Sequence, residues 1–255
     1  MKSVPLIQTW SVSFSSSMSI AENIAQLRER VASVAHRAGH RSEDVSLMAV
    51  TKGVLPAIIR EAYDAGIRVF GENRVQEFSA KDGVLAELKE AEWHMIGHLQ
   101  SNKAVRAVEL FSSIDSVDSV RLAQKLNTAA SNLKRRLPVL VEINIGGEQA
   151  KTGVAPDSAE LQDLLRVAPE LASLDLHGLM AVPPYSDDPK HSRSYFRKMR
   201  RLFEEIAARN LPGVQMEILS MGMSHDFEIA IEEGSTCVRI GTAIFGERKP
   251  ERSKT

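Results

Sequence analysis

Lys52 stands just after the apolar run Leu47-Met48-Ala49-Val50, at the expected carboxyl end of a buried strand. A lysine amine at the mouth of an apolar pocket loses hydration, which favours the neutral form that attacks an aldehyde. Lys52 is therefore a candidate for Schiff-base chemistry. The alternative is a lysine that only ends a strand at the surface, where most charged residues lie. Residues elsewhere in the chain must decide between the two.

A segment late in the chain has the composition of an anion-binding loop. Residues 220–224 read Ser-Met-Gly-Met-Ser, after an expected strand and before a helical stretch at 227–233. Gly222 would let the backbone approach an anion. Ser224 would either cap the helix or donate its hydroxyl to a phosphate oxygen.

A second segment of this kind follows the last expected strand. Gly241 and Thr242 again supply a small residue and a hydroxyl group. In barrels of eight parallel strands, phosphate typically binds after the seventh and eighth strands. Both segments therefore lie where that rule places a phosphate.

Arg239 lies on the last expected strand, on the same face as Cys237 and Gly241, because side chains alternate along a strand. If that face lines the interior, Arg239 is a buried cation that needs a partner. A pyridine nitrogen is one candidate acceptor, and a core carboxylate such as Glu142 is the other. Cys237 is interpreted as a small core residue.

Other strand ends add polar groups with less distinct roles. Asn73 would either hydrogen-bond a ring substituent of a ligand or cap the helix that follows it. His94 is interpreted as structural and His98 as a residue at the rim of a pocket. No third ligand accompanies the two histidines, so no metal site is expected.

These residues are placed by an alternation of short apolar strands with longer helical stretches. Ser19 and Glu22 predict a capping box for the first helix, and Pro56, Ser101 and the pair Asp157–Glu160 predict later helix starts. Eight strand–helix units favour a single (β/α)8 barrel over an open doubly wound sheet. The expected strands are 45–50, 68–72, 92–97, 110–115, 138–145, 174–180, 214–220 and 237–242.

Composition limits the classes of function. The chain has 255 residues, 43% hydrophobic and 25% charged, with a net charge of −1, which offers no strong field for nucleic acid or a membrane surface. The basic stretch at 193–201 is interpreted as a solvated helix face. No apolar run is long enough to span a membrane, and the single cysteine fits a reducing, cytoplasmic location.

Three regions are expected along the chain. Residues 1–18 are rich in serine and are predicted to be a disordered extension. Residues 19–248 form the barrel, and residues 249–255 form a tail. The barrel has no obvious exposed apolar stripe, which favours a monomer.

Several blocks of sequence together resemble the pyridoxal-phosphate homeostasis protein family, whose members are single-domain relatives of the amino-terminal barrel of alanine racemase. The resemblance extends from Ser19 to Arg248. The blocks are Ala49-Val50-Thr51-Lys52, Phe70-Gly71-Glu72-Asn73, the run from Trp93 to Lys103, His177-Gly178-Leu179-Met180, and the segments around Ser220 and Arg239.

The resemblance implies an alanine racemase N-terminal-domain-like barrel that holds pyridoxal 5'-phosphate as an aldimine on Lys52. Arg239 would lie at the pyridine nitrogen. The phosphate would be held by Ser224, Gly241 and Thr242, together with the backbone of Met221 and Gly222. The implied role is binding, buffering or delivery of the cofactor to pyridoxal-phosphate-dependent apoenzymes, without established catalysis.

Two enzymatic alternatives use the same lysine. An amino-acid racemase would need a second acid/base group opposite Lys52. Racemases of the related type take a tyrosine from a second domain, whereas this chain ends soon after the expected barrel and only Tyr185 lies on a loop that could reach the pocket. A phosphosugar aldolase fits the fold and the phosphate segments but not the blocks of resemblance.

Overall fold

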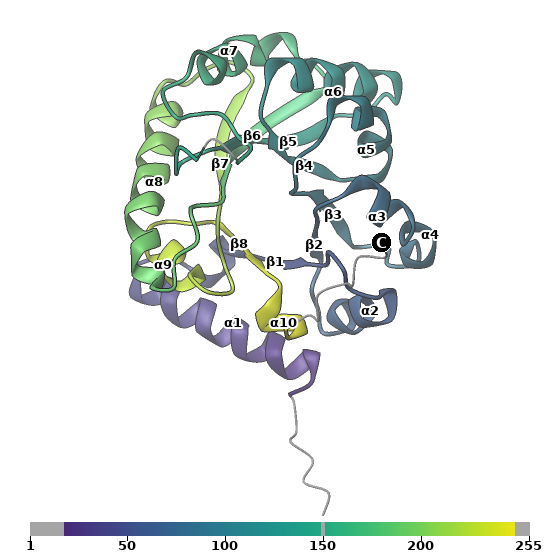
Figure 1. Ribbon diagram of the computed structural model, residues 1–255, viewed down its shortest axis with the longest axis vertical. Helices are drawn as coiled ribbons and strands as arrows, with labels where there is room; N and C mark the ends of the chain where they lie inside the picture. The colour runs from purple at the N-terminus through teal and green to yellow at the C-terminus, as the bar shows by residue number, and fades with distance from the viewer. Residues whose placement is uncertain (1–17, 149–150, 248–255) are drawn as a thin grey trace, which may run out of the picture.

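Eight parallel strands close into a barrel in sequence order, and β8 pairs with β1 (Figure 1). The computed structural model describes residues 18–148 and 151–247, so the predicted tail and nearly all of the predicted extension lie outside the described residues. The closed sheet confirms the (β/α)8 prediction and excludes the open sheet. The strands are β1 (Ser46–Val50), β2 (Val69–Glu72), β3 (Glu92–Met95), β4 (Ser113–Val117), β5 (Leu137–Ile143), β6 (Leu174–Ala181), β7 (Val214–Met223) and β8 (Cys237–Ile240).

Helices fill the connections and cover the outside of the barrel (Figure 1). The α-helices are α1 (Ile20–Arg37), α2 (Pro56–Asp64), α3 (Val75–Ser79), α4 (Asp82–Leu85), α5 (Ala104–Leu110), α6 (Val120–Asn132), α7 (Ala159–Val167), α8 (Ser192–Ala208), α9 (Phe227–Glu232) and α10 (Thr242–Phe245). Short 3₁₀ segments lie at Ser42–Asp44, Ser101–Lys103, Ala168–Glu170 and Pro189–His191. None of the described helices is both long and apolar enough to cross a membrane.

All eight expected strands are present; many of their bounds differ from the expected ones by one or two residues, and two strands have a bound that differs by three. The fourth strand was expected at 110–115 but lies at Ser113–Val117, because α5 continues to Leu110. The seventh was expected to end at 220 but continues to Met223, so most of the predicted anion-binding loop belongs to the sheet. Apolar residues in a helix end and in a strand look alike over a few positions, which explains the first error.

The helix starts were predicted with mixed success. The capping box of Ser19 and Glu22 is present, and Pro56 is the first residue of α2. Ser101 does not cap α5, which begins at Ala104 after the 3₁₀ segment.

The predicted pairing of Asp157 with Glu160 is also wrong. Ser158 caps α7 by accepting a hydrogen bond from the amide of Leu161. The Glu160 carboxylate instead accepts from the amide of Val120, 2.7 Å away at the start of α6. A contact between neighbouring helices therefore replaces the local one.

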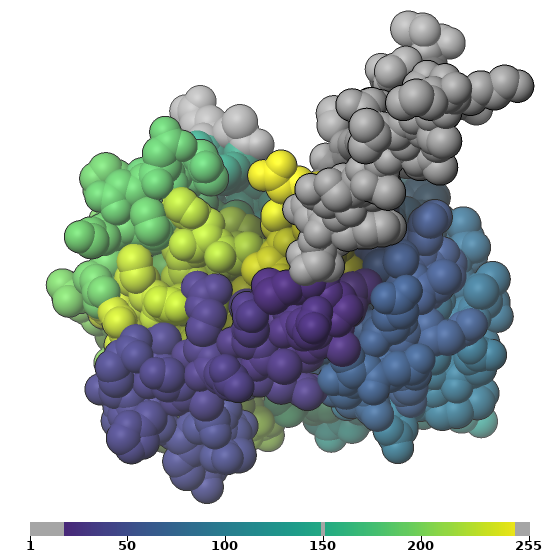
Figure 2. All heavy atoms as spheres, turned by 90° about the horizontal axis from the view of Figure 1, so that it is seen from below, coloured from purple at the N-terminus to yellow at the C-terminus, as the bar shows by residue number. Residues whose placement is uncertain are grey.

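The first helix covers the seam where the last strand meets the first. α1 contacts α9, α10 and α2, and it runs as a purple band across the face shown in Figure 2. The Asn23 side chain donates to the carbonyl of Ile244 at 2.9 Å, and Arg30 pairs with Glu228 at 2.8 Å. The amino-terminal helix is thus joined to the carboxyl-terminal units of the barrel.

The basic stretch of α8 is engaged in ion pairs on the surface. Arg193 and Arg197 both contact Glu233, at 2.5 and 3.0 Å, and Arg200 contacts Glu204 at 2.6 Å. These pairs agree with a solvated helix face.

An aromatic cluster packs α3 and α5 against the outside of the barrel. Phe78 of α3 lies 4.7 Å from Trp93 of β3 and 5.0 Å from Phe111, measured between ring centroids. Phe70 of β2 stacks on Trp93 at 4.8 Å. Phe78 is fully buried, so its ring contributes a large share of the contact between α3 and β3.

Phe78→Ala is expected to lower the free energy of unfolding by about 3–5 kcal/mol, because it removes a buried ring and leaves a cavity. Chemical denaturation measures this change. Val84→Ala is the control, since Val84 lies on the adjacent α4 but is 58% exposed. Equal effects of the two substitutions would contradict the importance of this cluster.

Candidate functional site

A cavity of about 360 Å³ opens at the carboxyl ends of β1, β6, β7 and β8, and we call it the Lys52 cavity. It brings together five of the eight predicted site residues from both ends of the chain. They are Lys52, Ser224, Arg239, Gly241 and Thr242. The other three, Asn73, Met221 and Gly222, do not line it.

Lys52 lies in the turn that follows β1 and is an exposed residue at the mouth of the cavity. Val50, the last residue of β1, also lines the cavity. The turn after β1 therefore places the lysine at the open end of the barrel.

Arg239 is buried and reaches the cavity from the middle of the barrel. Its guanidinium donates to the Ser220 hydroxyl at 2.6 Å and to the Ala181 carbonyl at 2.8 Å. Burial lowers the pKa of Arg239 from its ordinary value. Among the described residues Arg239 forms no ion pair, so the predicted alternative of direct pairing with Glu142 is wrong. The Glu142 carboxylate instead accepts a hydrogen bond from the Thr152 hydroxyl at 2.8 Å.

Ser224 connects the two predicted phosphate segments. Its hydroxyl oxygen accepts hydrogen bonds from the amides of Gly241 and Ala243, each at 3.3 Å. It does not cap α9, which begins three residues later at Phe227. Two backbone amides after β8 thus converge on one acceptor position beside the cavity, an arrangement suited to an anionic oxygen.

Gly222 allows α9 to pack closely against β7. Its φ is +94°, and a Cβ atom at this position would lie 2.5 Å from the Cβ of Ala230 on α9. Met221 is fully buried, and its carbonyl accepts from the Ser235 hydroxyl at 2.8 Å. Sequence cannot distinguish a glycine that admits a helix from one that admits an anion.

Asn73 lies in a neighbouring cavity of about 230 Å³, with His98 and Lys103. The Oδ1 atom of Asn73 is buried and has no hydrogen-bond partner among the described residues. His98 lies at the rim, as expected, with its Nδ1 3.2 Å from Asp118. The sequence predicted that Asn73 and Lys52 contact the same ligand, but the two residues line different cavities.

The loop after β6 forms a wall of the Lys52 cavity that sequence reasoning largely missed. Residues 183–186 line it, and Tyr185 is 77% exposed with its ring 5.8 Å from that of His225. His225 in turn contacts the carbonyl of Ser186 at 3.0 Å. The two prolines before Tyr185 were the available signal, since they stiffen a loop at a strand end.

A larger cavity of about 450 Å³ lies at the opposite end of the barrel, near the amino ends of β1 and β2. Arg28 and Arg68 line it, but their guanidinium groups already donate to backbone carbonyls. Active sites of such barrels lie at the carboxyl ends of the strands. The Lys52 cavity is therefore the better candidate.

The barrel interior below the cavity contains a buried polar pair. His94 Nδ1 lies 2.9 Å from Asp115 Oδ2, and Asp115 also accepts from Ser113 at 2.5 Å. Although burial opposes it, the Asp115 carboxylate raises the pKa of His94 to about 10 from 6.5. Burial raises the pKa of the Cys237 thiol to about 11, which agrees with an inert core residue. No cluster suited to a metal ion occurs among the described residues.

Comparisons with known proteins identify relatives that match nearly the whole chain. The family model of the alanine racemase N-terminal domain matches residues 22–249. The pyridoxal phosphate homeostasis protein of Aquifex aeolicus is 43% identical over 232 residues, which are 91% of this chain and 100% of the relative. The protein of the same name from Escherichia coli K12 is 42% identical over 231 residues, 90% of this chain and 97% of the relative.

Solved structures agree. PipY of Synechococcus elongatus, solved with pyridoxal phosphate (PLP) bound, has a TM-score of 0.78 and 38% identity over 89% of this chain and 100% of PipY. An alanine racemase of Clostridium difficile has a TM-score of 0.66 at 17% identity, over 90% of this chain and 58% of the racemase. At this identity the racemase supports the fold alone.

The His94–Asp115 pair predicts a dependence of stability on pH. Because the folded protein holds the His94 proton more tightly than the unfolded chain, the stabilisation is complete below pH 6.5 and is lost as the pH rises through about 10. The difference in unfolding free energy between the wild type and Asp115→Asn should therefore narrow from pH 6.5 to 10. A difference that stays constant in denaturation curves would contradict the assignment.

Proposed function

This chain belongs to the pyridoxal phosphate homeostasis protein family, and on this premise we propose that it binds pyridoxal 5'-phosphate in the Lys52 cavity. One observation carries the proposal. A lysine from the first strand–helix unit and, from the last, a buried arginine and two converging amides line or adjoin one cavity at the carboxyl ends of the strands.

The residues present fit this cofactor. The amine of Lys52 would condense with the aldehyde carbon, with loss of one water, to form a Schiff base. Arg239 is a buried donor without an ion pair among the described residues, and it suits the ring nitrogen as an acceptor. When bound, the cofactor supplies an electron-withdrawing ring. A guanidinium beside the nitrogen disfavours protonation of that nitrogen and so weakens the electron withdrawal.

The phosphate would be held where the segments after β7 and β8 meet. Ser224, Thr242 and the amides of Gly241 and Ala243 supply hydroxyl and N–H donors at this position. Met221 and Gly222 contribute indirectly, by packing β7 against α9.

We propose a role in buffering or delivering the cofactor rather than in turnover. A weakened electron withdrawal suits storage better than catalysis, and the relatives named above are called homeostasis proteins. The protein would act in the cytoplasm as a monomer and would contact pyridoxal-phosphate-dependent apoenzymes transiently. The single buried cysteine supports a reducing compartment.

Weak amino-acid racemase activity is a second candidate, because Tyr185 and His225 line the same cavity as Lys52. Either side chain could provide the second acid/base group that racemisation needs. Incubation of the loaded protein with D- and L-amino acids, followed by chiral analysis, tests this candidate. The absence of racemisation by the wild type would exclude the candidate, and activity that Tyr185→Phe and His225→Ala both leave unchanged would exclude these two side chains as the second acid/base group.

Wild-type protein mixed with pyridoxal phosphate is expected to gain visible absorbance and, after borohydride reduction, a stable adduct on Lys52. Peptide mass spectrometry locates the adduct. Lys52→Ala should lose the adduct without a loss of fold, since Lys52 is an exposed residue in a turn. A colourless wild type, or an adduct on another lysine, would refute the proposal.

Ser224→Ala is expected to weaken binding of pyridoxal phosphate by about tenfold, the effect of losing hydrogen bonds to a charged group. Pyridoxal, which lacks the phosphate, is the matched ligand and should bind the variant and the wild type equally. Titration of the absorbance measures both. An equal loss of affinity for the two ligands would place Ser224 away from the phosphate.

A further inference from the structure

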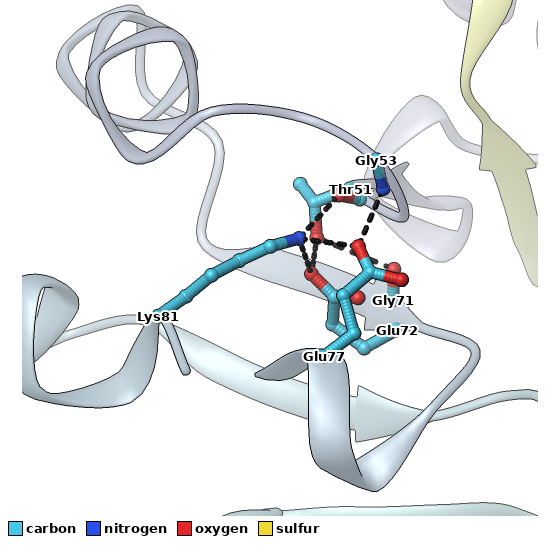
Figure 3. A network of polar contacts seen from close by, with 6 residues as sticks. All are labelled: Thr51, Gly53, Gly71, Glu72, Glu77 and Lys81. Atoms are coloured by element: carbon cyan, nitrogen blue, oxygen red, sulfur yellow. Dashed lines mark hydrogen bonds and ion pairs between the residues drawn. The ribbon is translucent and has the colours of Figure 1, made fainter. Parts of the chain in front are cut away.

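A partly buried cluster of charged side chains lies beside the turn that carries Lys52, outside the cavity. It consists of Glu72 at the end of β2, Glu77 of α3 and Lys81 between α3 and α4 (Figure 3). The Lys81 amine lies 3.0 Å from Glu72 and 2.7 Å from Glu77. Glu72 is fully buried, and the Lys81 side chain is 12% exposed. We call this group the carboxylate–lysine cluster.

The cluster holds the residue before Lys52. The Thr51 hydroxyl donates to Glu72 at 2.7 Å, and the Lys81 amine donates to the Thr51 carbonyl at 3.0 Å. The Thr51 amide donates to the carbonyl of Gly71 at 2.9 Å, which continues the sheet past the end of β1. Every polar group of Thr51 therefore has a partner.

The cluster also holds the residue after Lys52. The Gly53 amide donates to Glu77 Oε1 at 2.5 Å, and this oxygen is the one that contacts Lys81 (Figure 3). Gly53 has a φ of +67°, so the chain turns sharply there. The backbone on both sides of Lys52 is thus fixed to three charged side chains.

None of these three side chains lines the Lys52 cavity, so they would act on Lys52 through the backbone. Stability alone is a weak reason for such a cluster. Removing charges from water costs free energy, and apolar residues of similar size often stabilise a protein as well as a buried ion pair does. A buried polar network does, however, define one arrangement of the groups that it bonds.

We propose that Lys81, with Glu72 and Glu77, is a positioning residue for Lys52. By fixing the backbone at Thr51 and Gly53, the cluster holds the Lys52 amine at the mouth of the cavity, so that little conformational freedom is lost when the amine reacts. This inference rests on the proposed function. It gives Glu77 of α3 and Lys81, which follows that helix, a part in a site whose cavity they do not line.

The test compares Lys81→Met with Lys81→Arg, which keeps a cation and donors. Lys81→Met is expected to slow formation of the Lys52 adduct with pyridoxal phosphate by about tenfold, since charge-assisted hydrogen bonds are lost. In the protein without cofactor, the peptide covering 50–55 should exchange its amide hydrogens faster. Lys81→Arg should restore both measurements toward wild type.

Arg106→Met is the matched control. It removes a cation that donates to Ser79 of α3 at 2.8 Å but makes no contact with residues 51–53 among the described residues. If Lys81→Met folds poorly, Glu77→Gln serves in its place, because it removes the charge that pairs with Lys81 and keeps an oxygen for Gly53. Unfolding curves of all variants report global stability separately.

The inference is overturned if Lys81→Met changes the rate of adduct formation and the hydrogen exchange of residues 50–55 no more than Arg106→Met does. This holds whatever the two substitutions do to global stability. Failure of the proposed function would appear differently, as a wild type without an adduct on Lys52. In that case the hydrogen exchange still decides whether the cluster fixes this turn.

Discussion

The parallel pairing of β8 with β1 is the constraint on which the position of the site depends. Met48 lies opposite Arg239 in this pairing, so two segments from opposite ends of the chain share one register. Because all strands run the same way, their carboxyl ends meet at one rim, and Lys52 comes to lie over the same cavity as Ser224 and Thr242. An open sheet would have left these segments on separate edges.

Sequence predicted this arrangement well wherever a residue's role follows from its place at a strand end. Lys52, Arg239 and Gly241 could be placed on the same rim because strand order and alternation are readable from apolar periodicity. The sequence could not predict contacts between elements. Examples are the packing of α9 against Gly222, the contact of Glu160 with the neighbouring helix, and the loop after β6 that forms one side of the cavity. Such contacts have no local pattern.

The buried charges are satisfied by short-range partners of more than one kind. Arg239 donates to a hydroxyl and a carbonyl, whereas His94 and Lys81 contact carboxylates. Neutral partners leave the charge of Arg239 uncompensated, whereas carboxylate partners neutralise the charges of His94 and Lys81 within the protein. The Arg239 charge therefore lines the Lys52 cavity, whereas the His94 and Lys81 charges pair with carboxylates of neighbouring elements.

The covering of the β8–β1 seam by α1 has a consequence for synthesis of the chain. One edge of β1 pairs with β2, but its other edge pairs with β8, and α1 contacts α9 and α10 as well as α2. The β8 edge of β1 therefore stays unpaired until the last strand has been synthesised. Unpaired strand edges attract other chains. Closure of the barrel assembles the site at the rim. It also means that the nascent chain must pair β1 with its own β8 before a strand of another molecule pairs with β1.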